Sequence, residues 1–445
     1  MDLDKTSEKN IIFITIDCLR ADHLHCAGYK KNITPELDFL AKNGVLFTQA
    51  IANAPYTPYS VPSFLTSNMP PIKKNIRETL AELLKKRGYV TAAFNPNPIV
   101  FSTSFGGGGM INKGFDTYEM LLSTKKKYIL VIEEIRQNLM KRFRMAFNEK
   151  SRVHKIIFSL YDRAIRTLPS ILSPKQHLHI PSAEDVNKYA INWIKNRKEN
   201  FFLWIHYMDV HEPYAPPDYE NQKEMLYLIT KYRDFPNMLT ENEIQKLIDL
   251  YDLEIEYTDK AMSDLFKKLK ELNCFDNSII IISADHGDAF GEHGTLGHGG
   301  KFRAQVYDEV IRVPLIVYGY KKKGVLIDRQ VQLLDVAPTI CEMIDIPMSA
   351  SFFGESLFSS SEKGVIINSY PCIAYRTDQH KLIINKLGDK EDELYDLKAD
   401  PMEKKNIYNE KKKLKNKMES EMIDLLEKYK KKKKLLDVKG SLVEK

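Results

Sequence analysis

The sequence predicts an α/β protein with a mostly parallel central sheet and helices on both of its faces. Several short runs are almost continuously apolar and rich in β-branched residues, as expected of strands buried on both faces of a sheet. Helical segments alternate with these runs over most of the chain, and this alternation favours parallel pairing through helical crossovers. With 445 residues, 43% of them hydrophobic, the chain can build a large core.

The expected strands of this sheet recur from the N-terminus to the last third of the chain. They are Asn10–Asp17, Val45–Ala52, Tyr89–Phe94, Asn200–Asp209, Asn277–Ser283 and Arg312–Tyr318. After about residue 360, short strand-like runs (GVIINSY, CIAYRTD and KLIINKL) follow one another closely. Such spacing indicates antiparallel pairing, so we expect a small antiparallel sheet near the C-terminus.

Capping residues mark the helices between these strands. Thr34 and Pro35 begin one helix, which Gly44 ends. Asn75 is the expected cap of a second helix, which stops at Gly88. Two further helices begin at Ser182 and at Thr240, where Glu243 completes a capping box.

We therefore divide the chain into three parts. Residues 1–350 form the main α/β domain, and residues from about 120 to 180 within it predict a helical insertion, because they show helical spacing and no strand signal. Residues 351–410 form a small C-terminal α+β subdomain. Residues 411–445 form a helical tail rich in lysine.

Charge and composition limit the classes of partner. The net charge is +6, and the tail carries the lysine run Lys430–Lys434, which could make weak contact with an anionic membrane. No specific nucleic-acid binding is expected, because no aromatic residues interleave with this basic run. The N-terminal residues lack the features of a signal peptide and no apolar run is of membrane-spanning length, so we expect a cytoplasmic protein. Five scattered cysteines without a CxxC pair argue against a disulfide framework and a zinc-thiolate site.

Polar residues that can bind metals or anions follow three of the expected strands. Asp17 ends the first, Asp209 and His211 follow another, and Asp285 and His286 follow a third. Ligands of open α/β sheets bind just beyond the carboxyl ends of the strands. Carboxylates with imidazoles suit Mn²⁺, Zn²⁺, Mg²⁺ or Ca²⁺. The imidazole of His286 favours Mn²⁺ or Zn²⁺, with Ca²⁺ and Mg²⁺ as alternatives.

The order of several motifs resembles that of the sulfatase family, within the alkaline-phosphatase-like superfamily. The motifs are DCLRADHL from Asp17, GY from Gly28, TP from Thr34, HYMDVHEPY from His206, SADHGDAFGEHG from Ser283, RVPLI from Arg312, DVAPT from Asp335 and LYDL from Leu394. The resemblance implies an alkaline-phosphatase-like fold and hydrolysis of small anionic esters of sulfuric, phosphoric or phosphonic acid with one divalent metal ion.

The resemblance also assigns roles to residues. Asp17, Asp285 and His286 would bind the metal. His211 would bind the ester oxyanion or protonate the leaving group, and His298 would lie on the other side of the anion. Asn97 would also bind the substrate, and Lys301 or Arg303 could do so in place of His298. Asp209 could hold a second metal, but we expect one.

The nucleophile has two candidate positions. Sulfatases use a formylglycine made from Cys or Ser in a C/S-x-P-x-R setting; Ser60-Val61-Pro62 resembles this, but Phe64 stands at the arginine position. In the other register, the family's downstream Thr corresponds to Thr66 and the nucleophile to Thr57, nine residues earlier. We favour Thr57, as nucleophile and fourth metal ligand.

A threonine nucleophile shifts the expected substrate toward phosphate or phosphonate esters and away from sulfates. Two alternatives stay open. Thr57 could pass a phosphoryl-linked group to an alcohol, which would make the protein a transferase, or the chain could be an inactive relative that only binds its ligand. The sequence does not specify the natural substrate or the oligomeric state.

Overall fold

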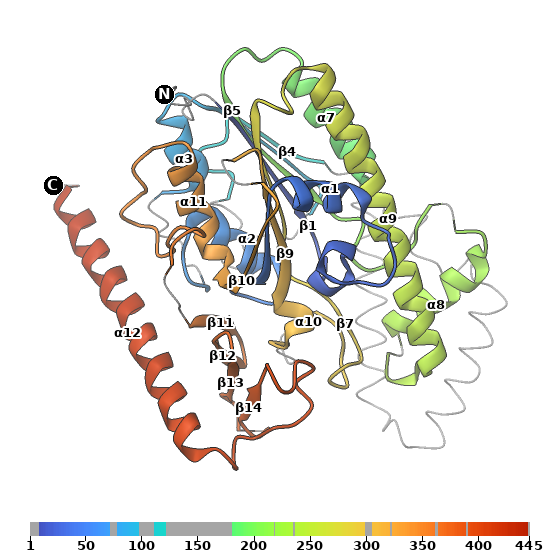
Figure 1. Ribbon diagram of the computed structural model, residues 1–445, viewed down its shortest axis with the longest axis vertical. Coiled ribbons are helices and arrows are strands. Elements are labelled where there is room, and N and C mark those ends of the chain that lie inside the picture. The colour runs from blue at the N-terminus through green and yellow to red at the C-terminus, as the bar shows by residue number, and fades with distance from the viewer. Residues whose placement is uncertain are drawn as a thin grey trace.

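The protein consists of one large sheet flanked by helices, a smaller sheet and a long C-terminal helix (Figure 1). The computed structural model describes residues 9–71, 78–97, 111–121, 180–217, 219–234, 236–298, 305–320, 323–360, 364–388 and 390–443. The expected helical insertion at about 120–180 lies almost wholly outside the described residues. The division into three parts therefore stays a prediction.

The large sheet has eight strands in the order β10-β2-β9-β6-β1-β5-β3-β4. Neighbouring strands are parallel except at β9, which is antiparallel to both β2 and β6. The prediction of a mostly parallel sheet is confirmed. The strands are β1 (Asn10–Ile16), β2 (Val45–Ile51), β3 (Val90–Asn95), β4 (Thr117–Met120), β5 (Phe201–Tyr207), β6 (Ser278–Ala284), β9 (Arg312–Tyr318) and β10 (Val325–Gln332).

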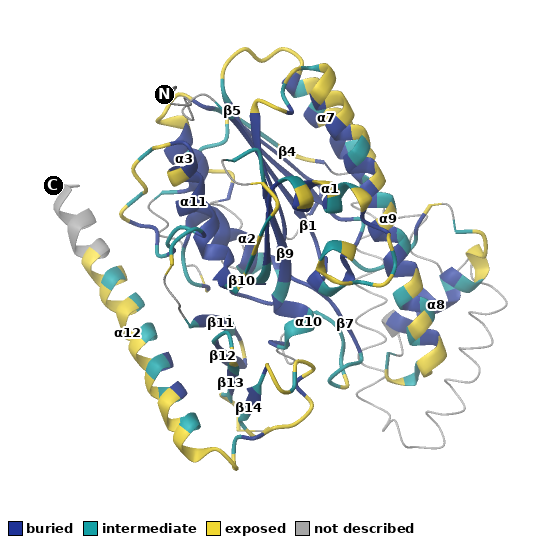
Figure 2. Cartoon of the chain, in the orientation of Figure 1, coloured by how far each residue is buried: buried dark blue, intermediate teal, exposed yellow. Residues whose placement is uncertain are grey.

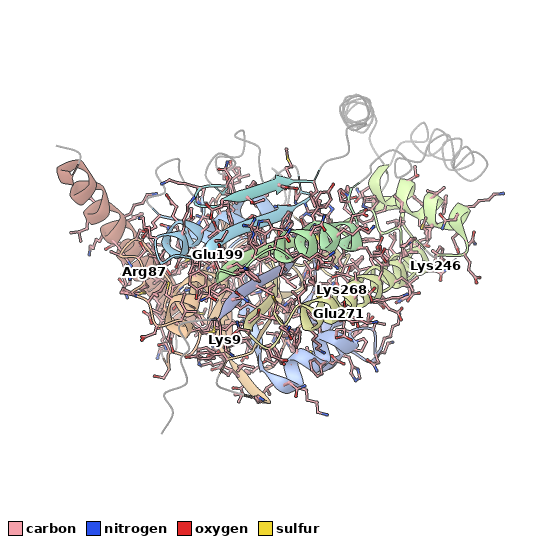
Figure 3. All side chains as sticks on the ribbon, turned by 90° about the horizontal axis from the view of Figure 1, so that it is seen from above. Lys9, Arg87, Glu199, Lys246, Lys268 and Glu271 are labelled. Carbon is pink, nitrogen blue, oxygen red and sulfur yellow. The ribbon has the colours of Figure 1, made fainter. Side chains whose placement is uncertain are left out.

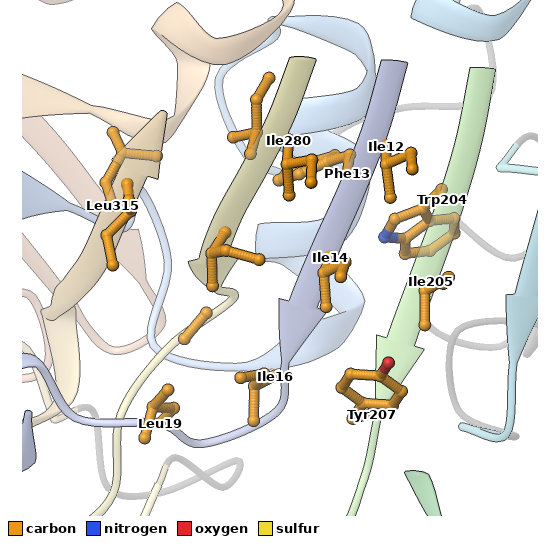
Figure 4. Packing of buried hydrophobic residues seen from close by; sticks show 14 of the residues in the cluster. Ile12, Phe13, Ile14, Ile16, Leu19, Trp204, Ile205, Tyr207, Ile280 and Leu315 are labelled. Carbon is orange, nitrogen blue, oxygen red and sulfur yellow. The ribbon is translucent and has the colours of Figure 1, made fainter. Parts of the chain in front are cut away.

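The three central strands form the core of the molecule. Every residue of β1, β5 and β6 is buried, because helices cover both faces of the sheet. Ile14 of β1 pairs with Ile205 of β5 on one side and with Ile282 of β6 on the other. Apolar side chains from all three strands pack side by side in one cluster (Figure 4). A rigid core therefore holds the carboxyl ends of these strands in register.

Helices lie on the two faces of the sheet (Figure 1). On one face are α1 (Pro35–Asn43), α7 (Ala183–Ile194) and α9 (Glu241–Glu271); on the other are α2 (Thr57–Thr66), α3 (Leu80–Lys85) and α11 (Val336–Met343). Exposed charges such as Lys268 and Glu271 line the outer side of α9 (Figure 3). The other elements of this part of the chain are α8 (Gln222–Asp234), α10 (Asp308–Ile311), β7 (Ala289–Phe290) and β8 (Leu296–Gly297).

The caps at Ser182 and Thr240 form as expected, and two others do not. Thr240 and Glu243 make a capping box at the start of α9, and Ser182 accepts the backbone N–H of Asp185. The helix expected from Asn75 is capped by Thr79 and Glu82 instead, and Asn75 lies outside the described residues. Thr34 precedes α1 without a side-chain capping bond.

A second sheet of four antiparallel strands follows the large one, as expected. Its strands are β11 (Val365–Ser369), β12 (Cys372–Arg376), β13 (His380–Asn385) and β14 (Glu393–Asp396), in that order. The helix α12 (Lys412–Val443) buries Met418 and Met422 against this sheet, and most of its remaining surface is exposed (Figure 2). Among the described residues, no helix is both long enough and apolar enough to cross a bilayer.

Candidate active site

The candidate active site lies where the central strands end. Asp17 follows β1, and Asp285 with His286 follows β6, its neighbour in the sheet. Asn97 follows β3, and Thr57 is the first residue of α2. Parallel strands place their carboxyl ends at one edge of a sheet, so residues far apart in the sequence converge here. All five side chains are buried.

The Thr57 hydroxyl lies among the three predicted metal ligands. Its oxygen is 3.3 Å from Asp17 Oδ2 and 3.1 Å from His286 Nε2. His286 Nε2 is in turn 3.6 Å from Asp17 Oδ1 and 3.4 Å from Asp285 Oδ2. The structure thus brings together Asp17, Thr57, Asp285 and His286, the four residues named from the sequence as metal ligands.

Ser60, the other candidate nucleophile, has a different contact. Its hydroxyl donates to the backbone carbonyl oxygen of Asp285 at 2.6 Å. Ser60 therefore fastens the first turn of α2 to the segment that follows β6. Among the described residues, the Thr57 hydroxyl is the one of the two that lies within hydrogen-bonding distance of Asp17 and His286.

The four residues fit a divalent cation. Asp285 Oδ2 is buried and has no hydrogen-bond partner among the described residues, although a buried carboxylate oxygen ordinarily has one. His286 Nδ1 lies 2.9 Å from the carbonyl oxygen of Gly287; its N–H donates there, so the Nε2 lone pair faces the carboxylates. Burial alone would raise the pKa of Asp17, but the charge of His211 and the hydrogen bond from His206 hold it well below its usual range. An ionised carboxylate is the form that binds metal.

His211 and His298 lie next to the four predicted metal ligands. The centroids of their rings are 4.9 Å apart, and the centroid of the His298 ring is 4.3 Å from that of His286. His298 Nδ1 is 3.2 Å from Asp288 Oδ1. Burial would lower the pKa of His298, but the Asp288 carboxylate raises it to about 9. His298 can therefore carry a positive charge at neutral pH where an anionic ester would bind.

Three residues that had no role assigned from the sequence also lie at this site. His206 Nε2 is 3.2 Å from Asp17 Oδ2. Asp288 holds His298 and also accepts a hydrogen bond from Tyr214. Cys18 Sγ is 3.2 Å from Asp17 Oδ1 and 3.3 Å from His298 Nδ1. His206 lies inside the buried strand β5, and the pairing of β5 with β1 brings its ring to Asp17.

Other predicted site residues lie elsewhere or are not described. Asn97 belongs to the group, because its Nδ2 donates to Asp17 Oδ2 at 2.8 Å. Asp209 Oδ1 accepts the backbone N–H of Ala183, at the start of α7, and none of the candidate metal clusters among the described residues includes Asp209. Lys301 and Arg303 lie outside the described residues.

Comparison with known proteins identifies the family and the fold. A family model described as sulfatase matches residues 9–346. A sulfatase of Formosa agariphila is 23% identical over 91% of this chain and 84% of its own length. A phosphonate monoester hydrolase of Agrobacterium radiobacter has the same fold, with a TM-score of 0.64 and 18% identity over 95% of this chain and 96% of its own.

A third similar protein was solved with its substrate D-glucosamine-2-N,6-O-disulfate. It has a TM-score of 0.64 and 20% identity, and the match covers 96% of this chain and 98% of that one. The two structural matches show the fold, whereas the family model spans most of the chain and shows the family. The chain therefore belongs to the sulfatase family of metal-dependent ester hydrolases, on an alkaline-phosphatase-like fold.

Proposed function

We propose that this chain hydrolyses phosphate or phosphonate esters, with Thr57 as the nucleophile. One observation carries the proposal: the Thr57 hydroxyl oxygen lies within hydrogen-bonding distance of Asp17 and His286. No cysteine stands at position 57 or 60, so the cysteine precursor of a formylglycine is missing at both. A threonine hydroxyl can attack phosphorus directly once it is activated.

Asp17, Thr57, Asp285 and His286 would hold one divalent cation. This set of two carboxylates, one hydroxyl and one imidazole favours Mn²⁺ or Zn²⁺, and Ca²⁺ or Mg²⁺ are the alternatives. The cation supplies positive charge that lowers the pKa of the Thr57 hydroxyl. Thr57 is also the first residue of α2, and the free N–H groups at a helix N-terminus favour a bound anion.

The reaction would then proceed in two steps. Thr57 Oγ1 loses its proton to solvent and forms a bond to phosphorus while the bond from phosphorus to the ester oxygen breaks, and the leaving alkoxide takes a proton from His298 or His211. Water then attacks the phosphorus of the phospho-threonine and one of its protons passes to the same imidazole. The Thr57 oxygen leaves and takes up a proton from solvent, which restores the hydroxyl. His298 suits the acid role because Asp288 keeps its pKa high, at about 9.

Two further candidates rest on specific observations. The family and the neighbour with a disulfated glucosamine substrate support sulfate ester hydrolysis through Ser60 or Thr57. A transferase would share the first step but give the phosphoryl-linked group to an alcohol in place of water. An inactive binding protein is disfavoured, because Asp17, Thr57, Asp285 and His286 are all present and brought together.

A substrate panel tests the proposal. p-Nitrophenyl sulfate, phosphate, bis-phosphate and phosphonate esters would be assayed with Mn²⁺, Zn²⁺ and Ca²⁺, each with and without an acceptor alcohol. We expect hydrolysis of a phosphorus ester, a mass increase of one phosphoryl group on the Thr57 peptide after rapid quenching, and loss of both in Thr57→Ala. Selective sulfate hydrolysis that survives in Thr57→Ala would refute the proposal, and product formed only with the alcohol would identify a transferase.

A further inference from the structure

A chain of buried polar groups leads to Asp17 from the central strands. The indole N–H of Trp204 donates to Thr15 Oγ1 at 2.9 Å. Thr15 Oγ1 lies 2.7 Å from His206 Nδ1, and His206 Nε2 lies 3.2 Å from Asp17 Oδ2. All four side chains are fully buried. The proposed metal site uses Asp17 but neither Trp204, Thr15 nor His206.

The two central strands bring these groups into line. Thr15 of β1 is paired in register with His206 of β5. Trp204 and His206 are two positions apart on β5, and side chains two positions apart point to the same face of a strand. Asp17 is likewise two positions after Thr15, directly beyond the end of β1. The chain of contacts therefore follows the pleat of two parallel strands toward their carboxyl ends.

The donors and acceptors fix which nitrogen of His206 carries a proton. The indole N–H can only donate, so it occupies one acceptor position of the Thr15 hydroxyl. The alternative acceptor for the Thr15 proton, the carbonyl of Ile205, is 3.4 Å away, and His206 Nδ1 at 2.7 Å is the closer partner. When Thr15 donates to Nδ1, that nitrogen carries no proton, so the ring N–H is on Nε2, where it donates to the Asp17 carboxylate.

The Asp17 carboxylate is held from two directions. Its Oδ2 accepts from His206 and, at 2.8 Å, from Asn97 Nδ2, whereas its Oδ1 is the oxygen 3.6 Å from His286 Nε2. These two donors, together with the Thr57 hydroxyl 3.3 Å from the same oxygen, set the plane of the carboxylate. Groups that hydrogen-bond to a metal ligand in this way orient it and tune its affinity for the metal.

We propose that His206 is a positioning residue for the metal ligand Asp17, and that Thr15 and Trp204 select the His206 tautomer that donates to it. The inference rests on the proposed function in that Asp17 binds the catalytic cation. It does not depend on the nucleophile or the substrate. Losing the Thr15 hydroxyl would free His206 to turn or to change tautomer, and would leave Asp17 with a weaker donor.

Mn²⁺ binding to the full-length chain tests the proposal without any turnover. Free Mn²⁺ would be measured by electron paramagnetic resonance during titration of metal-free protein. Because changes to such supporting groups typically weaken metal binding by about 10- to 100-fold, we expect Thr15→Val and His206→Leu to raise the Mn²⁺ dissociation constant by that factor. Thr15→Ser and His206→Gln keep a hydroxyl and an N–H donor, and should stay within about threefold of the wild type.

Two further measurements separate positioning from a role in folding. Thermal unfolding in the presence of a chelator reports on the metal-free fold, and a purely structural role would lower the melting temperature of Thr15→Val while leaving its Mn²⁺ affinity unchanged. Correlation spectra of ¹⁵N-labelled histidine should show a protonated Nε2 and an unprotonated Nδ1 at His206. Mn²⁺ affinity of Thr15→Val equal to wild type, or a protonated Nδ1 with an unprotonated Nε2, overturns the inference even if Thr57 proves to be the nucleophile.

Discussion

The hydroxyl oxygen of Thr57 lies 3.1 Å from Nε2 of His286, although 229 positions separate the two residues in the chain. Thr57 begins α2 and His286 follows β6, so the contact depends on the position of the start of α2 relative to the end of β6. One turn along α2, the Ser60 hydroxyl donates to the Asp285 carbonyl oxygen, and this bond fixes that position. Ser60 thus positions Thr57, and the two hydroxyls should respond differently to mutation.

Substitutions at these two positions distinguish the nucleophile from its support. Thr57→Ala should lower kcat on the best substrate by about 10³-fold or more, since loss of a nucleophile removes the covalent step. Thr57→Ser keeps a hydroxyl and should retain part of the activity. Ser60→Ala leaves the buried Asp285 carbonyl without this donor and should cost about 1–3 kcal/mol of folding stability, with a smaller loss of kcat. Steady-state kinetics and urea unfolding of the three variants check this; if Ser60→Ala alone abolishes activity, Ser60 is the nucleophile.

Metal binding should raise the stability of the protein through Asp285. The unpartnered Oδ2 of this buried carboxylate gains a partner when a cation binds. A ligand that binds only the folded state stabilises it by about 2.7 kcal/mol at one hundred times its dissociation constant. We expect Mn²⁺ or Zn²⁺ to raise the melting temperature in a concentration-dependent way and a chelator to reverse the rise.

Asp285→Asn provides the matched variant for that experiment. It keeps the size of the side chain but removes the charge, so the metal-dependent rise should shrink or vanish while the metal-free protein stays folded. Differential scanning calorimetry at several metal concentrations measures both. An equal rise in Asp285→Asn and wild type would show that the metal binds elsewhere.

Asn97 should act on the metal through Asp17. Its amide nitrogen donates to Asp17 Oδ2 at 2.8 Å, in addition to any contact with the substrate anion. Asn97→Ala should therefore raise the metal dissociation constant by about 10-fold and lower activity at limiting metal. Added metal should restore the activity of Asn97→Ala if Asn97 acts only through its hydrogen bond to Asp17. A raised KM that persists at saturating metal would show that Asn97 also binds the anion.

Much of the sheet could be predicted because the central strands β1, β5 and β6 are buried on both faces. Such strands must be continuously apolar, and this pattern stands out in a sequence. The edge strand β10 has no such pattern: Leu326 is exposed and Asp328 and Arg329 interrupt the apolar residues. The antiparallel direction of β9 was also beyond prediction, since periodicity carries no information on strand direction.

The residues of the candidate site also separate into those that the sequence could predict and those that it could not. Asp17, Asp285 and His286 could be named because they directly follow recognisable strands, and Thr57 through a motif. His206 was missed because it lies inside a buried strand, where a histidine in a sequence is indistinguishable from one satisfied in the core. Only the pairing of β1 with β5 shows that its ring reaches Asp17. The Asn75 cap failed for a local reason, because Thr79 with Glu82 offers a complete capping box closer to the buried residues of α3.

His293 gives the protein a pH-dependent contact between the loop that joins β7 to β8 and the C-terminal part of the chain. Its Nδ1 is 2.7 Å from Glu309 Oε1, its Nε2 is 3.2 Å from the backbone oxygen of Glu403, and its ring stacks on Tyr307 at 3.6 Å. Burial alone would lower the pKa of His293, but the hydrogen bond and charge of Glu309 raise it above its ordinary value. The folded state therefore holds this proton more tightly than the unfolded state.

The sign of the pH effect follows from that raised pKa. The stabilisation from charged His293 is fully present below the unfolded-state pKa of about 6.5 and is lost as the pH rises through the higher folded-state pKa. The wild type should exceed His293→Gln in free energy of unfolding at pH 6, and this difference should shrink toward pH 9. Urea unfolding of both proteins across that range, with metal held constant, measures it. A difference that stays constant or grows with pH would show that His293 is held as the neutral imidazole, because only the charged form gains from Glu309 as described.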